Sequence, residues 1–130
     1  MAEASRITLR AVDITKSYDE VRALDRVSVD IVEGEFLTLL GPSGSGKTTF
    51  LMCLAGFVEP TSGRLEEDGV DVSHRPAEDR RYGMVFQGYA LFPHMSVADN
   101  VAFPLKVAKT PKAERERLVT EMLETVGLTP

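Results

Sequence analysis

The sequence has little cysteine: Cys53 is the only one among 130 residues. A single cysteine cannot form a disulfide within the chain, and no Cys or His lies near it at metal-ligand spacing. We therefore interpret Cys53 as a small apolar residue on a helix, as suits a reducing cytosol. Basic residues are not in excess either, since 15 Lys and Arg stand against 20 Asp and Glu. The net charge of −5 argues against a nucleic-acid partner.

Long hydrophobic runs are missing as well. Apolar runs such as Phe36 to Leu40, which contains one Thr, are far shorter than the roughly 18 residues of a membrane-spanning helix. Residues 1–10 show no apolar segment typical of a secretory signal. An apolar content of 43% nevertheless suffices for the core of one small globular domain. Any association with a membrane is therefore expected to run through a partner protein.

The first part of the chain contains two kinds of strand pattern. Alternating apolar residues predict a strand over 7–18 and another over 27–31, with a turn at Glu33-Gly34. These two strands are expected to form an antiparallel subdomain with one solvated face. The nearly continuous apolar run at 36–40 instead predicts a strand that is buried on both faces.

Helical spacing and turn residues organise the rest. A helix is predicted from Lys47 to Ala55, with Leu51 and Leu54 on its apolar face and Gly56 as its stop. The pattern then predicts a strand pair in 64–72 around Asp68-Gly69, a loop over 73–81, a strand over 82–86 and a loop over 87–95. Two further helices are predicted. One runs from a Ser96/Asp99 capping box to Phe103 before Pro104, and the other runs from Thr110-Pro111 to Gly127 with Leu118, Met122 and Val126 on its apolar face.

A glycine-rich motif follows the run at 36–40. Gly41-x-x-x-x-Gly46-Lys47-Thr48 matches the P-loop pattern in full. Glycines permit a left-handed backbone, so that successive N–H groups and the start of the next helix face one anion. Lys47 adds a positive charge for the β- and γ-phosphates, and the Thr48 hydroxyl suits Mg²⁺. The alternative is a flexible Gly/Ser loop. The expected nucleotide contacts here are Ser43, Gly44, Ser45, Gly46, Lys47, Thr48 and Thr49.

With this motif, Tyr18 upstream and Gln87 downstream, the sequence resembles the nucleotide-binding subunits of ABC transporters. Thr15-Lys16-Ser17-Tyr18 looks like the family's A-loop, which implies that Tyr18 stacks on the adenine of ATP. Read alone, Tyr18 is a packing residue at a strand end. Met84-Val85-Phe86-Gln87 resembles the Q-loop, which implies that Gln87 contacts Mg²⁺ and the attacking water. The implied catalytic residues are thus Lys47 and Gln87, the implied metal contacts are Thr48 and Gln87, and the cofactors are ATP and Mg²⁺.

The segment 87–101 looks most like importers of polyamines, ferric iron and sugars, and Tyr-Ala-Leu-Phe-Pro-His-Met at 89–95 is its specific part. In the family, this region helps to form a groove for a short helix of the membrane permease. An apolar group in a loop suits such a partner surface. Anchoring of the loop in the core is an equally good interpretation. The apolar residues are Tyr89, Leu91, Phe92 and Met95.

Three parts of the family's machinery are not in the sequence: a Ser-Gly-Gly-Gln signature, an apolar Walker B strand ending in Asp-Glu, and a switch histidine. His74 and His94 are interpreted as surface or interface residues instead. We therefore expect the 130 residues to bind nucleotide without turning it over. We also expect 36–40 to expose an apolar edge, because the Walker B strand would lie beside it. Two alternatives stay open: another P-loop enzyme such as a nucleoside monophosphate kinase, and a non-catalytic nucleotide-binding fragment.

The predicted fold class is α/β: a P-loop NTPase core with an N-terminal antiparallel β subdomain, and without the Walker B strand. The predicted parts are the β subdomain at 1–34, the P-loop core as far as the Q-loop at 35–95, and the start of a helical subdomain at 96–130. The resemblance implies a subunit that couples ATP hydrolysis to solute import. Its expected partners are a membrane permease and, in the complete protein, a second copy, at the cytoplasmic face of the inner membrane.

Overall fold

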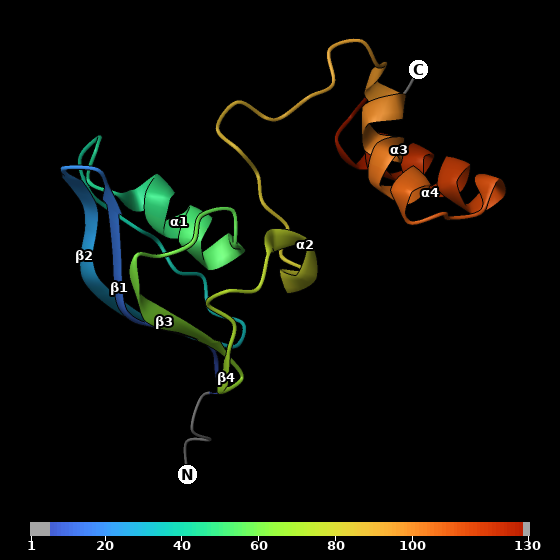
Figure 1. Ribbon diagram of the computed structural model, residues 1–130. Helices are drawn as coiled ribbons and strands as arrows, with labels where there is room; N and C mark the ends of the chain where they lie inside the picture. The colour runs from blue at the N-terminus through green and yellow to red at the C-terminus, as the bar shows by residue number, and fades with distance from the viewer. Residues whose placement is uncertain (1–5, 129–130) are drawn as a thin grey trace. The chain divides into compact units, whose positions relative to one another are not determined.

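The computed structural model describes residues 6–128, which fall into two compact units on either side of Met84 (Figure 1). The division into 1–34, 35–95 and 96–130 stays a prediction. The first unit contains β1 (Ile7–Tyr18), β2 (Val21–Val32), α1 (Lys47–Ala55), β3 (Ser62–Glu67), β4 (Val70–Asp71) and α2 (Ala77–Arg80), and the second contains α3 (Val97–Val107) and α4 (Lys112–Thr125).

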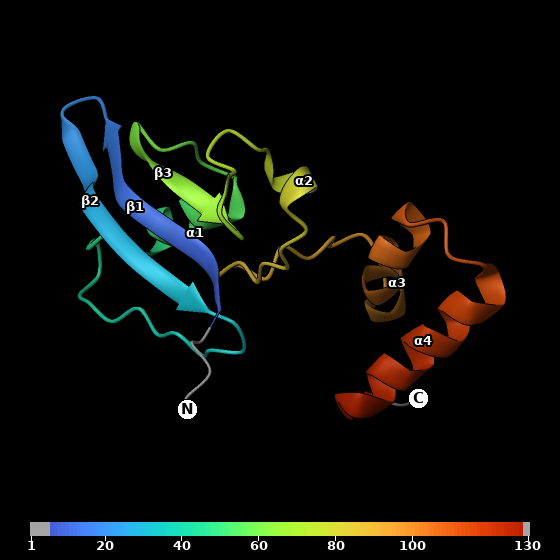
Figure 2. The ribbon, with the colours of Figure 1, turned by 90° about the horizontal axis from the view of Figure 1, so that it is seen from below.

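The first unit is built on an antiparallel sheet with the strand order β2-β1-β3-β4, whose first three strands Figure 2 shows side by side. This confirms the predicted pairing of the first two strands and the short strand pair around Asp68-Gly69. Asp68 and Gly69 both have positive φ, 48° and 78°, which is the backbone that a two-residue hairpin turn requires.

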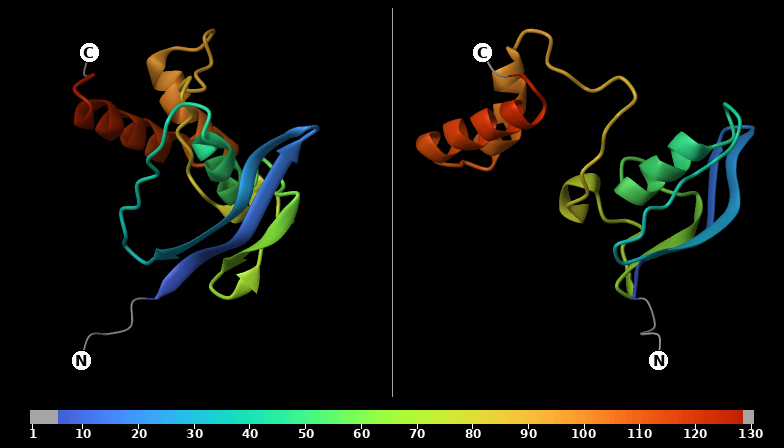
Figure 3. Two further views of the ribbon diagram at one scale, coloured as in Figure 1. Left: turned by 90° about the vertical axis from the view of Figure 1, so that its left-hand side faces the viewer. Right: turned by 180° about the vertical axis from the view of Figure 1, so that it is seen from behind.

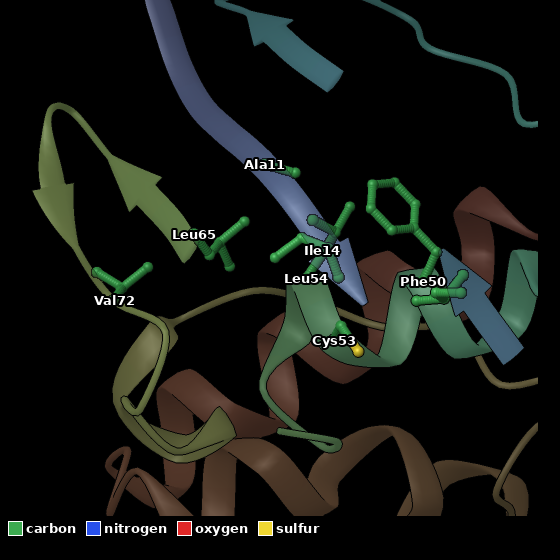
Figure 4. Close-up of a cluster of buried hydrophobic side chains, with 8 residues drawn as sticks. Ala11, Ile14, Phe50, Cys53, Leu54, Leu65 and Val72 are labelled. Atoms are coloured by element: carbon green, nitrogen blue, oxygen red, sulfur yellow. The ribbon is translucent and has the colours of Figure 1, made fainter. Parts of the chain in front are cut away.

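One helix, α1, covers one face of this sheet (Figure 3). Its bounds agree with the prediction, and Gly56 ends it in the left-handed conformation at φ 85°. Its buried side chains are Phe50, Cys53 and Leu54, whereas Leu51 is 46% exposed, so the predicted apolar face is rotated. These three residues meet Ala11, Ile14, Leu24, Leu65 and Val72 in the hydrophobic core (Figure 4).

The strands predicted at 36–40 and 82–86 are wrong, because both segments are irregular in the structure. A strand forms through hydrogen bonds to neighbouring strands, and neither segment belongs to the four-stranded sheet in residues 6–128. Phe36 is 94% exposed, Leu40 97% and Val85 89%. The expected exposure of apolar side chains at 36–40 is therefore confirmed, but on irregular chain rather than on a strand edge.

The second unit is a helical hairpin in which Ala102 of α3 and Val119 of α4 are buried. The predicted stop before Pro104 is wrong: α3 continues to Val107, because the carbonyl of Pro104 still accepts from the N–H of Ala108 at 2.9 Å. α4 has Pro111 rather than Thr110 as its N-cap. In the first unit, the predicted loop at 73–81 contains the short helix α2. Within the described part of the chain, no helix has the length and apolar character needed to cross a membrane.

Candidate nucleotide-binding site

The P-loop is held against the β-sheet by close backbone packing at Gly46. Gly46 is the N-cap of α1 and has φ 92°, in the left-handed region that favours glycine. A Cβ atom at this position would lie 2.4 Å from the carbonyl oxygen of Ala23 in β2. Any other residue would therefore push the loop away from the sheet.

The first turn of α1 faces the loop with its backbone donors. The N–H groups at the start of a helix have no carbonyl partner within the helix, and the helix dipole makes this end partly positive. The N-cap makes no side-chain hydrogen bond, and the first turn carries no acidic residue. Lys47, Thr48 and Thr49 thus start a helix whose N-terminus favours a bound anion.

The ammonium of Lys47 binds the P-loop itself in this structure. Its Nζ donates to the carbonyl oxygens of Gly41 at 2.7 Å and Pro42 at 2.6 Å, and to Ser45 Oγ at 3.1 Å. These acceptors hold the side chain over the loop rather than extended into solvent. Its predicted contact with phosphate stays a prediction, as do the nucleotide contacts predicted for the other P-loop residues: Ser43, Gly44, Ser45, Gly46, Thr48 and Thr49.

Thr48 has the chemistry that a magnesium site needs. It is the second residue of α1, and its side chain is exposed. Mg²⁺ prefers oxygen ligands and keeps several waters, so a single hydroxyl beside phosphate oxygens fits its usual surroundings.

Tyr18 lies at the end of β1 that pairs with the part of β2 next to the P-loop. It pairs with Val21 of β2, and Ala23, which touches Gly46, is two residues further along the same strand. Two residues of strand span about 7 Å. Tyr18 is 47% exposed, so it offers accessible surface beside the loop.

Gln87 belongs to the second unit and is exposed. Its contact with Mg²⁺ and the attacking water therefore stays a prediction. The loop that follows it carries Tyr89 and Ala90 with positive φ, 62° and 52°.

The apolar residues after Gln87 divide into two kinds. Tyr89 and Leu91 are 75% and 67% exposed. Phe92 instead packs on Phe103 of α3, with ring centroids 4.6 Å apart, and Met95 is half-buried. The two interpretations of this loop, partner surface and core anchor, thus apply to different residues of it.

Asn100 of α3 holds this loop in shape, and the sequence reasoning missed it. Its Oδ1 accepts from the N–H of Phe92 at 2.8 Å. Its Nδ2 lies within hydrogen-bond distance of the carbonyl oxygens of Phe92, Met95 and Ser96, at 3.0 to 3.3 Å. The sequence signal that could have indicated this role is an Asn in the first turn of a helix that follows a proline-containing loop. The Ser96 cap at the start of this helix is confirmed, since Ser96 Oγ accepts from the N–H of Asp99 at 3.1 Å.

Arg80 was also missed, because a charged residue is expected at the surface. Its side chain is buried and donates from Nη1 to the carbonyls of Cys53 and Leu54, both at 2.9 Å, in the last turn of α1. The two histidines are placed as predicted: His74 is exposed and contacts the exposed Glu59, and His94 lies at the edge of the Phe92 ring.

An apolar hollow of about 370 Å³ opens beside the P-loop. Its walls come from β2, from residues 38–40, from the loop and from Phe50 of α1. Such walls suit apolar side chains better than a triphosphate, and they adjoin the exposed segment at 36–40.

The loop has glycines in the left-handed backbone conformation, and it lies beside the sheet at the start of the helix α1. This arrangement defines a nucleotide-binding protein of the P-loop class. Residues 24–130 match the family model described as ABC transporter, so the chain belongs to the ABC transporter family. This confirms the resemblance found in the sequence.

The individual matches agree with that membership. A sulfate/thiosulfate import ATP-binding protein of Agrobacterium fabrum is 53% identical over 120 residues, which cover 89% of this chain and 35% of that protein. A spermidine/putrescine import ATP-binding protein of Nitrosomonas eutropha is 51% identical over 116 residues, covering 89% and 32%. The chain thus spans about a third of the length of the curated relatives it matches.

A solved structure supports the predicted fold class. The ATP-binding cassette MJ0796, in a dimeric structure with ADP and Pi, superposes with a TM-score of 0.77 at 30% identity. The match covers 89% of this chain and 56% of that one. The α/β cassette fold is therefore confirmed.

Proposed function

We propose that this chain binds ATP with Mg²⁺ and belongs to the ATP-binding subunit of a solute importer. The observation that carries the proposal is the P-loop, with Gly46 at φ 92° on the N-terminus of α1 and Lys47 over the loop. In binding, Lys47 exchanges the carbonyls of Gly41 and Pro42 for phosphate oxygens. Thr48 and Gln87 are the residues that would hold Mg²⁺, and the ion would neutralise the triphosphate charge. Tyr18 receives the adenine.

Family membership favours this proposal over a nucleoside monophosphate kinase. The relatives named above are import ATP-binding proteins. Hydrolysis also needs a carboxylate that polarises the attacking water, and the 130 residues contain no apolar strand ending in Asp-Glu. We therefore propose that this chain binds nucleotide without turning it over, and that hydrolysis needs groups beyond these residues.

The partner is proposed to be a membrane permease that docks at residues 89–95, with Gln87 transmitting the state of the nucleotide to that surface. Exposed apolar residues at this loop support a docking role. A second copy of the complete subunit is the other proposed partner, since the MJ0796 cassette is dimeric. The proposed location is the cytoplasmic face of the inner membrane, through the permease.

A titration with a fluorescent ATP analogue tests the binding site. Lys47→Ala is expected to weaken binding at least about tenfold, because it removes the side chain that carries charge to the phosphates. Lys112→Ala, which changes an exposed lysine of α4, is the matched control and should bind as the wild type does. Equal affinity of the Lys47→Ala variant and the wild type would contradict the proposal. Phosphate release that is lost in Lys47→Ala would contradict the absence of turnover.

A further inference from the structure

Lys16 covers one face of the Tyr18 ring. Its Nζ lies 5.0 Å from the ring centroid, within the range of a cation–π interaction. The same ammonium donates to the carbonyl oxygen of Glu59 at 2.9 Å. Lys16 thus links the Tyr18 ring to the segment that follows α1.

The backbone around this pair is fixed as well. The N–H of Ser17 donates to Thr61 Oγ1 at 3.0 Å, and the N–H of Thr61 donates to the carbonyl of Thr15 at 2.8 Å. These bonds hold the end of β1 on the loop between α1 and β3. The backbone of the strand end is therefore held by hydrogen bonds, and the orientation of the ring depends on its side-chain torsions.

We propose that Lys16 is a positioning residue that holds the Tyr18 ring as a preformed platform and directs the purine base to the opposite ring face. This inference rests on the proposed function, in which Tyr18 receives adenine. A ring that is already oriented loses less rotational freedom when the base stacks on it. Tyr18 is 47% exposed as a residue, and with the ammonium on one ring face the other face is the one proposed for the ligand. The triphosphate itself does not need Lys16.

Two ligands separate an effect on the base from a general effect on phosphate binding. They are ATP, and inorganic tripolyphosphate, which has no base. Each is titrated against the 130-residue chain and its variants by calorimetry. Lys16→Met keeps the aliphatic stem and removes the charge, and it should weaken ATP binding about 2- to 5-fold while leaving tripolyphosphate binding unchanged. Lys16→Arg keeps a cation over the ring and should bind ATP nearly as the wild type does.

A double-mutant cycle with Tyr18→Ala completes the test. Tyr18→Ala should weaken ATP binding about 5-fold or more, and adding Lys16→Met should then have no further effect. Lys112→Met is the matched control for loss of a lysine charge.

Three outcomes would overturn the role of Lys16. The first is that Lys16→Met loses as much affinity for tripolyphosphate as for ATP. The second is that Lys16→Met loses the same affinity for ATP with and without the Tyr18 ring. The third is that Lys16→Met loses no affinity for ATP although Tyr18→Ala does. If Tyr18→Ala bound ATP as tightly as the wild type, the adenine platform itself would fail and the role of Lys16 with it. The proposed phosphate site is judged separately by Lys47→Ala, which should weaken both ligands.

Discussion

At the scale of single residues, Arg80 is a cation that is 3% exposed and bound entirely to carbonyl oxygens. Its burial lowers its pKa, but arginine stays protonated at any pH at which proteins fold. The positive charge lies at the C-terminus of α1, where the helix dipole favours it. Arg80 also binds the carbonyls of Ser73 and Arg75, so it fastens α1 to the chain that leads towards Gln87.

Replacing Arg80 by methionine should therefore destabilise the first unit. Arg80→Met removes the side-chain donor of four carbonyl groups, of which that of Cys53 keeps the N–H of Gly56, and we expect the free energy of unfolding to fall by about 3 kcal/mol. Urea denaturation measures this loss. Arg81→Met changes the exposed neighbouring arginine and should alter the free energy by no more than about 0.5 kcal/mol. Equal stability of the two variants would contradict the structural role of Arg80.

The titration of the Tyr82 hydroxyl should be distinguishable from that of the other tyrosines. Burial, and then its hydrogen bond to Glu67 Oε1 at 2.7 Å, raises the pKa of Tyr82 to about 12. Because this is above the unfolded value of about 10, its contribution to stability is complete below pH 10 and is lost as the pH rises through about 12. Absorbance at the tyrosinate band should show a late step for one of the three tyrosines, and Tyr82→Phe should remove it. A single common step near pH 10 would contradict the contact with Glu67.

The sequence could predict the roles of some residues and not of others. Lys47 and Thr48 occupy fixed places in the P-loop motif. Because the motif works through local backbone geometry, its eight consecutive residues suffice to predict their roles. Arg80 instead binds the carbonyls of Cys53 and Leu54, which are 27 and 26 residues away in the sequence, so its role depends on distant contacts that a residue type alone does not reveal. Asn100 binds the backbone of Phe92, Met95 and Ser96, at most eight residues away, so its role depends on the local shape of the loop before α3.

At the scale of elements, the same distinction separates the correct predictions from the wrong ones. α1 is bounded by local signals, the loop glycine before it and Gly56 after it, and it forms as predicted. The strand pair at Asp68-Gly69 is likewise set by its own turn. The apolar runs at 36–40 and 82–86 need neighbouring strands far away in the sequence, and without a ladder partner in residues 6–128 they stay irregular.

The loop before α3 should lose its shape without Asn100. Asn100→Ala removes the bonds to the backbone of Phe92, Met95 and Ser96, so we expect the N–H of Phe92 to exchange with solvent at least about tenfold faster. Hydrogen exchange followed by NMR measures this rate. Asn100→Asp keeps the acceptor for the N–H of Phe92 and should protect it better than alanine does. Unchanged exchange in Asn100→Ala would show that the Phe92–Phe103 packing alone fixes the loop.

At the scale of the whole molecule, the division at Met84 separates the P-loop from Gln87. The first unit carries the proposed phosphate and adenine contacts, and the second carries the proposed permease surface. A glutamine at the start of the second unit is well placed in the sequence to report nucleotide binding to that surface, as a local switch with a remote effect.

The proposed permease surface is tested in the proposed full-length subunit. Tyr89 and Leu91 are large apolar residues of the loop that are 75% and 67% exposed, whereas Phe92 also anchors the loop on Phe103. Tyr89→Ser with Leu91→Ser should therefore remove apolar contact area without unfolding the loop, and it should weaken co-purification with the permease at least about tenfold. ATP affinity should stay unchanged, because neither residue belongs to the P-loop.

The control for this experiment is Val107→Ser, which removes another exposed apolar side chain from the second unit, 67% exposed at the end of α3. It should co-purify with the permease as the wild type does. Phe92→Ser is expected to weaken assembly too, but together with faster hydrogen exchange in the loop, because it loses the Phe103 contact. If the Tyr89/Leu91 double variant assembles and transports normally, this loop is not the docking surface, and the packing of Phe92 on Phe103 is what its apolar residues contribute.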